Sequence, residues 1–432
     1  MPRSSIVLRS LGLAAGLWVA AMLPAGAADT LCAFRDGPRG PCTCKTAADG
    51  PGQFTVVAKR RCRTETKAKA PSVEAAKAPP SGPASEAQAR EQPSAESAAA
   101  EGVTPITTGA LPSPSAGTSR LDQIRARGKL ICGVGTGLLG FSAQTEAGDW
   151  SGIDVAFCQA LAAAVLGDAS KTDFVPLETN ERFEALRDGK IDVLSRNTTW
   201  TMAREVDMGL RFAGTLYFDG QGFMTRGERG LVSAQQLGGS KVCVEAGTTS
   251  EVNMAFYFKT HQIEAEIMSL PTREEMVTSY ERGSCDTVSG DRSGLYALRA
   301  TLPDPTQHDI LPEVISKEPL GPAVLKEDDE WAEITRWTLA GLVNAEEVGL
   351  DRASAAASDP LSGDAERLVQ GAGASGEKLR LGKTWLRDVV AASGNYGEIF
   401  DRNVGKGSPL GMERGLNALW KRGGLLSAPP MW

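Results

Sequence analysis

Histidine is almost absent from this chain. Its 432 residues include only two histidines, His261 and His308, and neither lies near another metal-ligand residue at a useful spacing. A histidine-based catalytic triad and a zinc enzyme are therefore not expected. We expect the protein to need neither a metal nor a cofactor.

The chain also lacks an excess of positive charge. Its formal net charge is -7 at pH 7, with 46 basic and 53 acidic residues. Proteins that bind nucleic acids carry an excess of basic side chains, because much of their affinity comes from phosphate contacts. We therefore expect no nucleic-acid partner.

Only the N-terminus carries a long apolar run. Arg3 and Arg9 precede apolar residues 11–23, and Ala25-Gly26-Ala27 follows, which is the pattern of a secretory signal peptide over residues 1–27. A membrane anchor is the alternative, but about 13 apolar residues fall short of the roughly 20 that span a bilayer. No cysteine follows the expected cleavage site before Ala28, so no lipid anchor is expected. We expect an exported, soluble mature protein.

The cysteines form two groups. An exported protein with an even number of cysteines is expected to pair them as disulfides. A zinc site in the first group is the alternative, but its C-x-C spacing is not typical of zinc sites. The first group favours a small disulfide-stapled module over residues 28–63, followed by a disordered linker rich in Ala, Pro, Ser and Glu over residues 64–118. The eight cysteines are Cys32, Cys42, Cys44 and Cys62 in the first group, and Cys132, Cys158, Cys243 and Cys285 in the second.

From Ser119 onward, strand and helix patterns alternate. Such alternation predicts an α/β fold with a parallel sheet covered on both faces. The pattern begins again near Leu237 and ends at Asp291, which indicates a second α/β unit. The expected elements of the first unit are strands 129–134, 171–175 and 190–195 and helices 121–127, 156–165 and 180–188. In the C-terminal part we expect helices 330–345, 385–392, 396–402 and 414–421.

The stretch 195–208, SRNTTWTMAREVDM, follows the third of these strands. Polar loops at strand ends are where α/β proteins bind ligands. Thr199 and Thr201 offer hydroxyl donors, and the planar guanidinium of Arg204 fits a carboxylate through two parallel hydrogen bonds. In the alternative interpretation Thr201 only caps a helix and Arg204 pairs with a neighbouring acidic side chain, either Glu205 or Asp207.

Several motifs together resemble one protein family over residues 119–432. They include RGKLICGVGTGLLGFS, ERFEALRDGKIDVLSRNTTWTMAREVDMGLRF, VCVEAGTTSE and SGNYGEIFDRNVGKGSPLGMERGLNALWKRGGL. The chain is similar to periplasmic solute-binding proteins of polar amino-acid ABC transporters, above all to general L-amino-acid-binding proteins. The resemblance implies two α/β lobes, residues 119–217 with 313–432 and residues 218–312, joined by two crossing strands.

The resemblance also implies which residues bind the ligand. In the family's T-x-x-R pattern the arginine holds the ligand α-carboxylate, and Arg204 matches it. The acidic residue that receives the α-ammonium matches Asp291. The other positions implied to surround the ligand backbone are Asn197 and Thr199 in the first lobe and Gly247, Thr248 and Thr249 in the second.

Selective members of the family often clamp the ligand side chain between aromatic rings. Here Leu138 and Thr179 stand at those positions, and Phe141 lines the cleft or belongs to the core. Without aromatics or a dedicated charge the site should discriminate weakly. The resemblance therefore implies a monomeric protein that binds L-amino acids broadly and delivers them to an ABC permease in the inner membrane.

Two other functions remain open. Some periplasmic dehydratases use the same fold, and such an enzyme needs an acid beside the leaving hydroxyl, a role for which Glu178 or Glu245 is available. A stand-alone sensor domain is the third possibility.

Within the two lobes we expect Cys132 to pair with Cys158 and Cys243 with Cys285, because the latter two begin adjacent parallel strands.

Overall fold

The structure is a computed structural model that describes residues 31–34, 42–45, 55–56, 119–145 and 147–432. Its contacts divide the chain into two units, residues 1–105 and 106–432. In the first unit, strands β1 (Leu31–Phe34), β2 (Cys42–Lys45) and β3 (Thr55–Val56) form an antiparallel sheet in the order β1-β2-β3. The expected signal peptide, the linker and most of the cysteine module lie outside the described residues.

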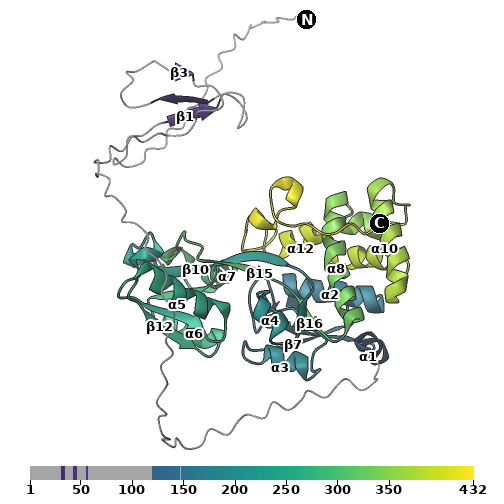
Figure 1. Cartoon of the computed structure of the whole chain (residues 1–432), viewed down its shortest axis with the longest axis horizontal. Coiled ribbons are helices and arrows are strands. Elements are labelled where there is room, and N and C mark those ends of the chain that lie inside the picture. Colours follow the sequence, from purple (N-terminus) through teal and green to yellow (C-terminus); the bar gives the residue numbers. More distant parts are fainter. Residues whose placement is uncertain (1–30, 35–41, 46–54, 57–118, 146) are drawn as a thin grey trace, which may run out of the picture. The chain divides into compact units, whose positions relative to one another are not determined.

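The second unit contains two sheets, and each is the centre of one lobe (Figure 1). In the first lobe the strand order is β7-β4-β8-β16-β9. Strand β4 pairs in parallel with β7 and β8, whereas β16 runs antiparallel to both β8 and β9. The sequence predicted a parallel sheet, but the sheet is mixed. The strands are β4 (Leu130–Val134), β7 (Thr172–Pro176), β8 (Val193–Leu194), β9 (Leu210–Phe212) and β16 (Ala323–Leu325).

The helices of the first lobe cover this sheet. Helix α2 is the central one, because nearly all of its apolar sequence IDVAFCQALAAAVL is buried. Its amphipathic neighbours α8 and α11 pack in the same core. The helices are α1 (Arg120–Arg127), α2 (Ile153–Leu166), α3 (Arg182–Arg187), α4 (Met202–Val206), α8 (Asp329–Val348), α9 (Arg352–Ala356), α10 (Gly363–Gly376), α11 (Trp385–Ser393) and α12 (Tyr396–Asn403).

One expected helix is wrong. Residues 414–421 form only two short 3₁₀ turns, Gly415–Asn417 and Trp420–Arg422. Gly415 has φ +47° and Gly423 has φ +89°, and these left-handed backbone conformations interrupt a helix. The chain bends back tightly instead, because a Cβ on Gly424 would lie 1.8 Å from the Ala418 carbonyl oxygen.

In the second lobe the strand order is β12-β11-β13-β10-β14. Strand β11 is parallel to β12 and β13, and β10 is antiparallel to β13 and β14. The strands are β10 (Tyr217–Arg226), β11 (Lys241–Glu245), β12 (Glu266–Leu270), β13 (Thr287–Asp291) and β14 (His308–Ile310). The helices are α5 (Thr249–His261), α6 (Arg273–Glu281) and α7 (Arg292–Thr301).

Two strands cross from one lobe to the other. Strand β15 (Ser316–Leu320) pairs with β10 from Tyr217↔Leu320 to Gln221↔Ser316, and Figure 1 shows this pair spanning the space between the lobes. Just before β10 and just after β15 the backbones touch, because a Cβ on Gly321 would lie 2.0 Å from the Gly214 carbonyl oxygen. We call this pair of crossing strands the hinge.

Each lobe also holds one disulfide, and both expected pairings are confirmed. Cys132 in β4 is bonded to Cys158 in α2, with the Cα atoms 6.3 Å apart. Cys243 in β11 is bonded to Cys285, just before β13, with the Cα atoms 5.8 Å apart. Both bonds join residues of the same lobe, so neither restrains the movement of one lobe against the other.

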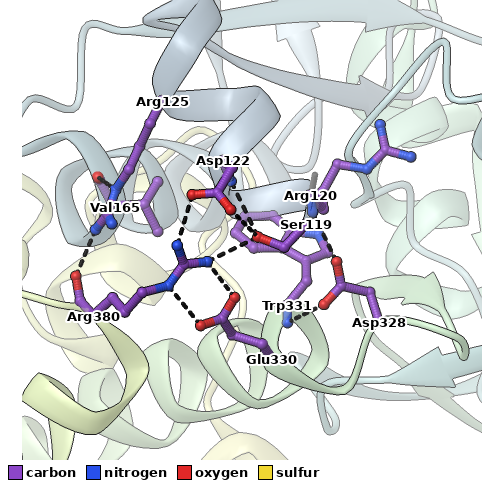
Figure 2. Close-up of polar contacts among 9 residues, drawn as sticks. All are labelled: Ser119, Arg120, Asp122, Arg125, Val165, Asp328, Glu330, Trp331 and Arg380. Atoms are coloured by element: carbon purple, nitrogen blue, oxygen red, sulfur yellow. Dashed lines mark hydrogen bonds and ion pairs between the residues drawn. The ribbon is translucent and has the colours of Figure 1, made fainter. Parts of the chain in front are cut away.

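Helix α1 is fixed to the C-terminal part of the first lobe by one arginine (Figure 2). The Arg380 guanidinium donates to Asp122 Oδ1 at 2.6 Å and to Ser119 Oγ at 2.8 Å, both at the start of α1. It also forms a two-bond pair with Glu330 in α8. Arg125 returns a bond from α1 to the Arg380 carbonyl oxygen at 2.6 Å. We call these residues the Arg380 network.

Candidate functional site: a cavity between the two lobes

A cavity that is partly open to solvent lies between the lobes. Its walls come from strand ends and helix starts of both lobes, as expected for ligand sites in α/β proteins. The first lobe contributes Leu138, Thr179, Arg182, Arg196, Asn197, Thr199 and Arg204; the second contributes Val244, Glu245, Thr248, Thr249, Ser250, Arg273, Met276, Ser289, Gly290, Asp291, Gly294, Leu295 and Leu298.

The loop after β8 is held in place by Asp154 at the start of α2. One oxygen of this carboxylate accepts a hydrogen bond from Ser195 Oγ at 3.0 Å, and the other accepts the backbone N–H of Asn197 at 2.9 Å. Burial raises the pKa of Asp154 to about 6. Asn197 itself has φ +32°, a conformation that few residues other than glycine adopt. The loop is thus fixed around a buried carboxylate.

Arg204 lies on α4 with its guanidinium turned inward. Thr201 caps the helix, since its hydroxyl accepts the backbone N–H of Arg204 at 3.2 Å, as the alternative interpretation expected. The guanidinium, however, pairs with neither Glu205 nor Asp207. It donates to the Thr199 carbonyl oxygen at 2.5 Å and the side chain is only 7% exposed. Its remaining N–H groups are available to an anion in the cavity.

The second lobe presents the start of α5 to the cavity. Thr248 caps this helix by accepting the backbone N–H of Glu251, and Thr249 Oγ1 lies 3.3 Å from Thr199 Oγ1 of the first lobe. Gly247 does not line the cavity: it is exposed, and its N–H donates to Glu251 Oε2 at 3.0 Å. Thr248 and Thr249 therefore lie where they were expected, and Gly247 lies just outside.

Asp291 lies at the end of β13, facing the first lobe. Asn197 Nδ2 donates to its carboxylate at 3.4 Å across the cavity. Burial is the main cause that raises the pKa of Asp291 well above its usual range, and the nearby carboxylates of Asp219 and Glu318 raise it further. The Arg204 guanidinium lowers it in part. A cationic group placed beside Asp291 would relieve this repulsion.

Of the remaining residues predicted to bind the ligand, some line the cavity and one does not. Leu138 and Thr179 both line the cavity, whereas Phe141 does not. Phe141 is only 1% exposed and packs edge-on against Tyr217, with the ring centroids 5.2 Å apart. It is a core residue that supports the start of β10.

Four charged residues of the cavity were not predicted as ligand-binding. They are Arg182, Arg196, Arg273 and Glu245. Arg196 stands directly before Asn197, and its guanidinium donates to the Leu177 carbonyl oxygen at 2.8 Å and to Thr179 Oγ1 at 2.9 Å. Its place in the SRNTT stretch could have drawn attention to it. Glu245 was considered only as a catalytic acid, and nothing in the sequence marks Arg182 or Arg273 as ligand-binding.

Several of these polar groups join the lobes directly. Thr179 Oγ1 donates to Glu245 Oε1, and Arg196 Nη2 lies 3.8 Å from the same oxygen. Together with the Thr199–Thr249 contact, they bring the lobes together around the cavity. Glu245 is therefore committed to bonds with the first lobe, which does not favour its use as a free acid.

Residues 130–386 match the family model of bacterial extracellular solute-binding proteins, family 3. The chain belongs to this family. This solute-binding protein is 46% identical over 325 residues to the general L-amino acid-binding periplasmic protein AapJ of Rhizobium johnstonii, covering 74% of this chain and 95% of that one. It is 43% identical over 327 residues to the glutamate/glutamine/aspartate/asparagine-binding protein BztA of Rhodobacter capsulatus, covering 75% and 97%.

A solved structure of the same kind is similar as well. A periplasmic binding protein of an ABC transporter from Brucella ovis, with glutathione bound, shares 45% identity and superposes with a TM-score of 0.70, covering 73% of this chain and all of that one. The described residues of this solute-binding protein include no helix that is long and apolar enough to cross a membrane. They also include no group of acidic, histidine or cysteine side chains that could hold a metal ion.

Proposed function

We propose that the protein binds free L-amino acids with broad specificity in the periplasm and delivers them to an ABC-type permease in the inner membrane. The observation that carries this proposal is that Arg204 of one lobe and Asp291 of the other line a single cavity. An amino acid is a zwitterion, and both of its charges need partners when it leaves water. Arg204 offers a fork for the α-carboxylate, and Asp291 offers a carboxylate for the α-ammonium.

The polar groups around this pair complete the proposed backbone site. Thr199 and Asn197 lie on the loop before Arg204, while Thr248 and Thr249 begin helix α5. The positive end of a helix favours an anion, so α5 would assist Arg204 in holding the carboxylate. The relatives AapJ and BztA, whose names state that they bind amino acids, support this assignment.

The organisation of the chain follows from the same proposal. We place the first lobe at residues 119–217 and 313–432 and the second at 218–312, moving about the hinge as a monomer. Cleavage before Ala28 would release a mature protein that carries the cysteine module and the linker at its N-terminus. A role as an enzyme is not favoured, because the relatives are named as binding proteins and Glu245 is bonded to Thr179.

Calorimetric titration of the purified, ligand-stripped protein with each of the twenty amino acids tests the function. We expect one ligand per chain, binding to several amino acids and no conversion of any of them. Product formation in the same samples would support the dehydratase alternative. An absence of binding to every amino acid would refute the proposal.

A further inference from the structure

Arg182, at the first position of α3, is a buried charge of the cavity that forms no hydrogen bond within the described part of the chain. Its side chain lines the cavity and is only 4% exposed. Its buried Nε has no partner among the described residues. The guanidinium lies over the face of the Phe183 ring, 4.7 Å from the centroid.

The charges around Arg182 compensate it only in part. Burial lowers the pKa of Arg182 well below its usual range, and repulsion from Arg196 and Arg204 lowers it further, whereas Glu245 and Asp291 raise it by less. Burying an ion is strongly unfavourable unless an opposite charge is bound to it. A guanidinium kept in such a place is therefore suited to receive an anion that the protein does not itself supply.

The other three arginines of the cavity differ in how far they are satisfied. Arg196 is bonded to Leu177, Thr179 and Glu245. Arg204 is assigned to the α-carboxylate. Arg273, on α6 of the second lobe, has one long hydrogen bond, 3.4 Å to the Gly294 carbonyl oxygen.

The charges on the cavity wall also favour an anionic group on the ligand. On the cavity wall itself four guanidinium groups face two carboxylates, Glu245 and Asp291, and the carboxylates of Asp219 and Glu318 add negative charge near Asp291. A zwitterionic ligand with a neutral side chain adds no net charge, so it leaves the local excess of guanidinium groups on the wall unchanged. A ligand with one further negative group beside Arg182 and Arg273 would reduce this excess.

We propose that Arg182 and Arg273 form a subsite for a second carboxylate, so that amino acids with an acidic side chain bind more tightly than their uncharged counterparts. This inference rests on the proposed function and adds to it a ranking within the broad set of ligands. The expectation of weak discrimination assumed that no dedicated charge faces the ligand side chain, and these two arginines are such charges.

One other role for Arg182 competes with this one. The Arg204 guanidinium lies 5.4 Å from the centroid of the same Phe183 ring, so both arginines lie beside one aromatic side chain. Arg182 could then share the α-carboxylate with Arg204. The two roles differ in their effect on ligands that have the same backbone and side chains of different charge.

L-glutamate and L-glutamine provide that comparison, because they have nearly the same size and differ in charge. We expect the wild-type protein to bind glutamate about tenfold or more tightly than glutamine, the effect of one charge-assisted hydrogen-bonded pair. In Arg182→Gln the affinity for glutamate should fall by about tenfold or more, while the affinity for glutamine changes less than about threefold. Arg187→Gln is the matched control, since Arg187 is exposed on the same helix.

The outcomes separate the two proposals. If Arg182→Gln weakens both ligands by the same factor, Arg182 holds the α-carboxylate and the second-carboxylate subsite is refuted. If the wild-type protein binds several amino acids but does not prefer glutamate, the subsite is likewise refuted and the proposed function stands. If no amino acid binds, both fail.

The thermal stability of the ligand-free protein gives a second readout. Removing an unpaired buried charge should leave the melting temperature of Arg182→Gln equal to or above that of the wild type, whereas loss of a structural arginine would lower it. If that variant does not fold, Arg273→Gln takes its place and should also lower the ratio of glutamate to glutamine affinity. An unchanged ratio in Arg273→Gln would then overturn the proposal.

Discussion

Ligand binding should weaken as the pH falls, because in the proposed site an ionised Asp291 receives the ligand ammonium. Three carboxylates, from Asp219, Asp291 and Glu318, lie close together where β10, β13 and β15 meet. Burial raises the pKa of Asp219 to about 6 and that of Asp291 well above its usual range. Because of this raised pKa, Asp291 of the ligand-free protein takes up a proton at a higher pH than an exposed carboxylate does, and ligand binding must then release that proton.

The size of the effect follows from proton linkage. When one proton is released for each ligand bound, the dissociation constant rises by about tenfold for each pH unit below the pKa. We expect Kd for L-glutamine to be higher at pH 5 than at pH 7, by up to about a hundredfold over these two pH units. L-glutamine is the suitable probe because its own side chain does not titrate. Calorimetry at pH 5.5 in buffers with different ionisation enthalpies would measure the released proton directly.

The ligand-free protein should respond to pH in the opposite direction. Because the pKa values of Asp219 and Asp291 are higher in the folded than in the unfolded state, their ionisation as the pH rises destabilises the fold, and this effect disappears as the pH falls. For Asp219, a rise from 3.8 to about 6 corresponds to roughly 3 kcal/mol. His308 opposes the trend, since burial lowers its pKa, so each variant must be compared with the wild type at every pH.

Asp291→Asn isolates the contribution of one carboxylate. This variant should bind glutamine about tenfold to a hundredfold more weakly at pH 7, since the ammonium loses its charged partner, and its Kd should depend little on pH. Asp309→Asn, at an exposed position of the same lobe, should keep the wild-type dependence. If Asp291→Asn retains the full pH dependence of the wild type, another group titrates and the assignment of Asp291 is wrong.

Three further predictions concern other parts of the molecule. Arg204→Lys should raise Kd for every amino acid by a similar factor of about ten or more, because lysine cannot form two parallel hydrogen bonds with the α-carboxylate. An effect confined to one or two ligands in the same titrations would show that Arg204 contacts the ligand side chain. Thr179→Val removes the hydroxyl that donates a hydrogen bond to Glu245 across the cavity. We expect small-angle scattering to show a less closed protein and ligand titration to show a Kd raised about three- to tenfold. Unchanged affinity would mean that this contact is not needed for closure. Deleting residues 28–118 behind the signal peptide should leave Kd and the melting temperature of the two lobes unchanged, and a large fall in either would show that the deleted part packs on them.

The elements with local signals were predictable from the sequence. Helix α1 ends at Gly128, which has the left-handed conformation that its position after a helix indicates. Strands β4 and β13 are short buried runs. Cys243 and Cys285 pair as expected because neighbouring parallel strands lie within disulfide range, and Cys132 in β4 pairs with Cys158 on the helix that covers it. Helix α10 was missed because it contains Gly371, which normally argues against a helix. Here a Cβ on Gly371 would lie 2.4 Å from the Met431 carbonyl oxygen, so close packing requires the glycine.

The cavity was predictable only where a motif marked it. Arg204 and Asp291 belong to recurring patterns, and both line the cavity. Arg182 and Arg273 come from helices of different lobes, and only the closed arrangement brings them to one site. Their spacing along the chain does not indicate that they lie at the same cavity. The sequence alone therefore did not reveal that these two arginines line the same cavity.

The Arg380 network also determines how the two lobes would carry a mechanical load. Everything before Ser119 is attached through α1, and α1 is bonded to Arg380 and, through it, to Glu330 in α8 (Figure 2). A pull on the N-terminal part of the chain would enter the first lobe at this point and spread into its helices. The hinge begins only at Tyr217, so the crossing strands would carry none of the tension. A protein held by its N-terminus could thus open and close its cavity as freely as one in solution.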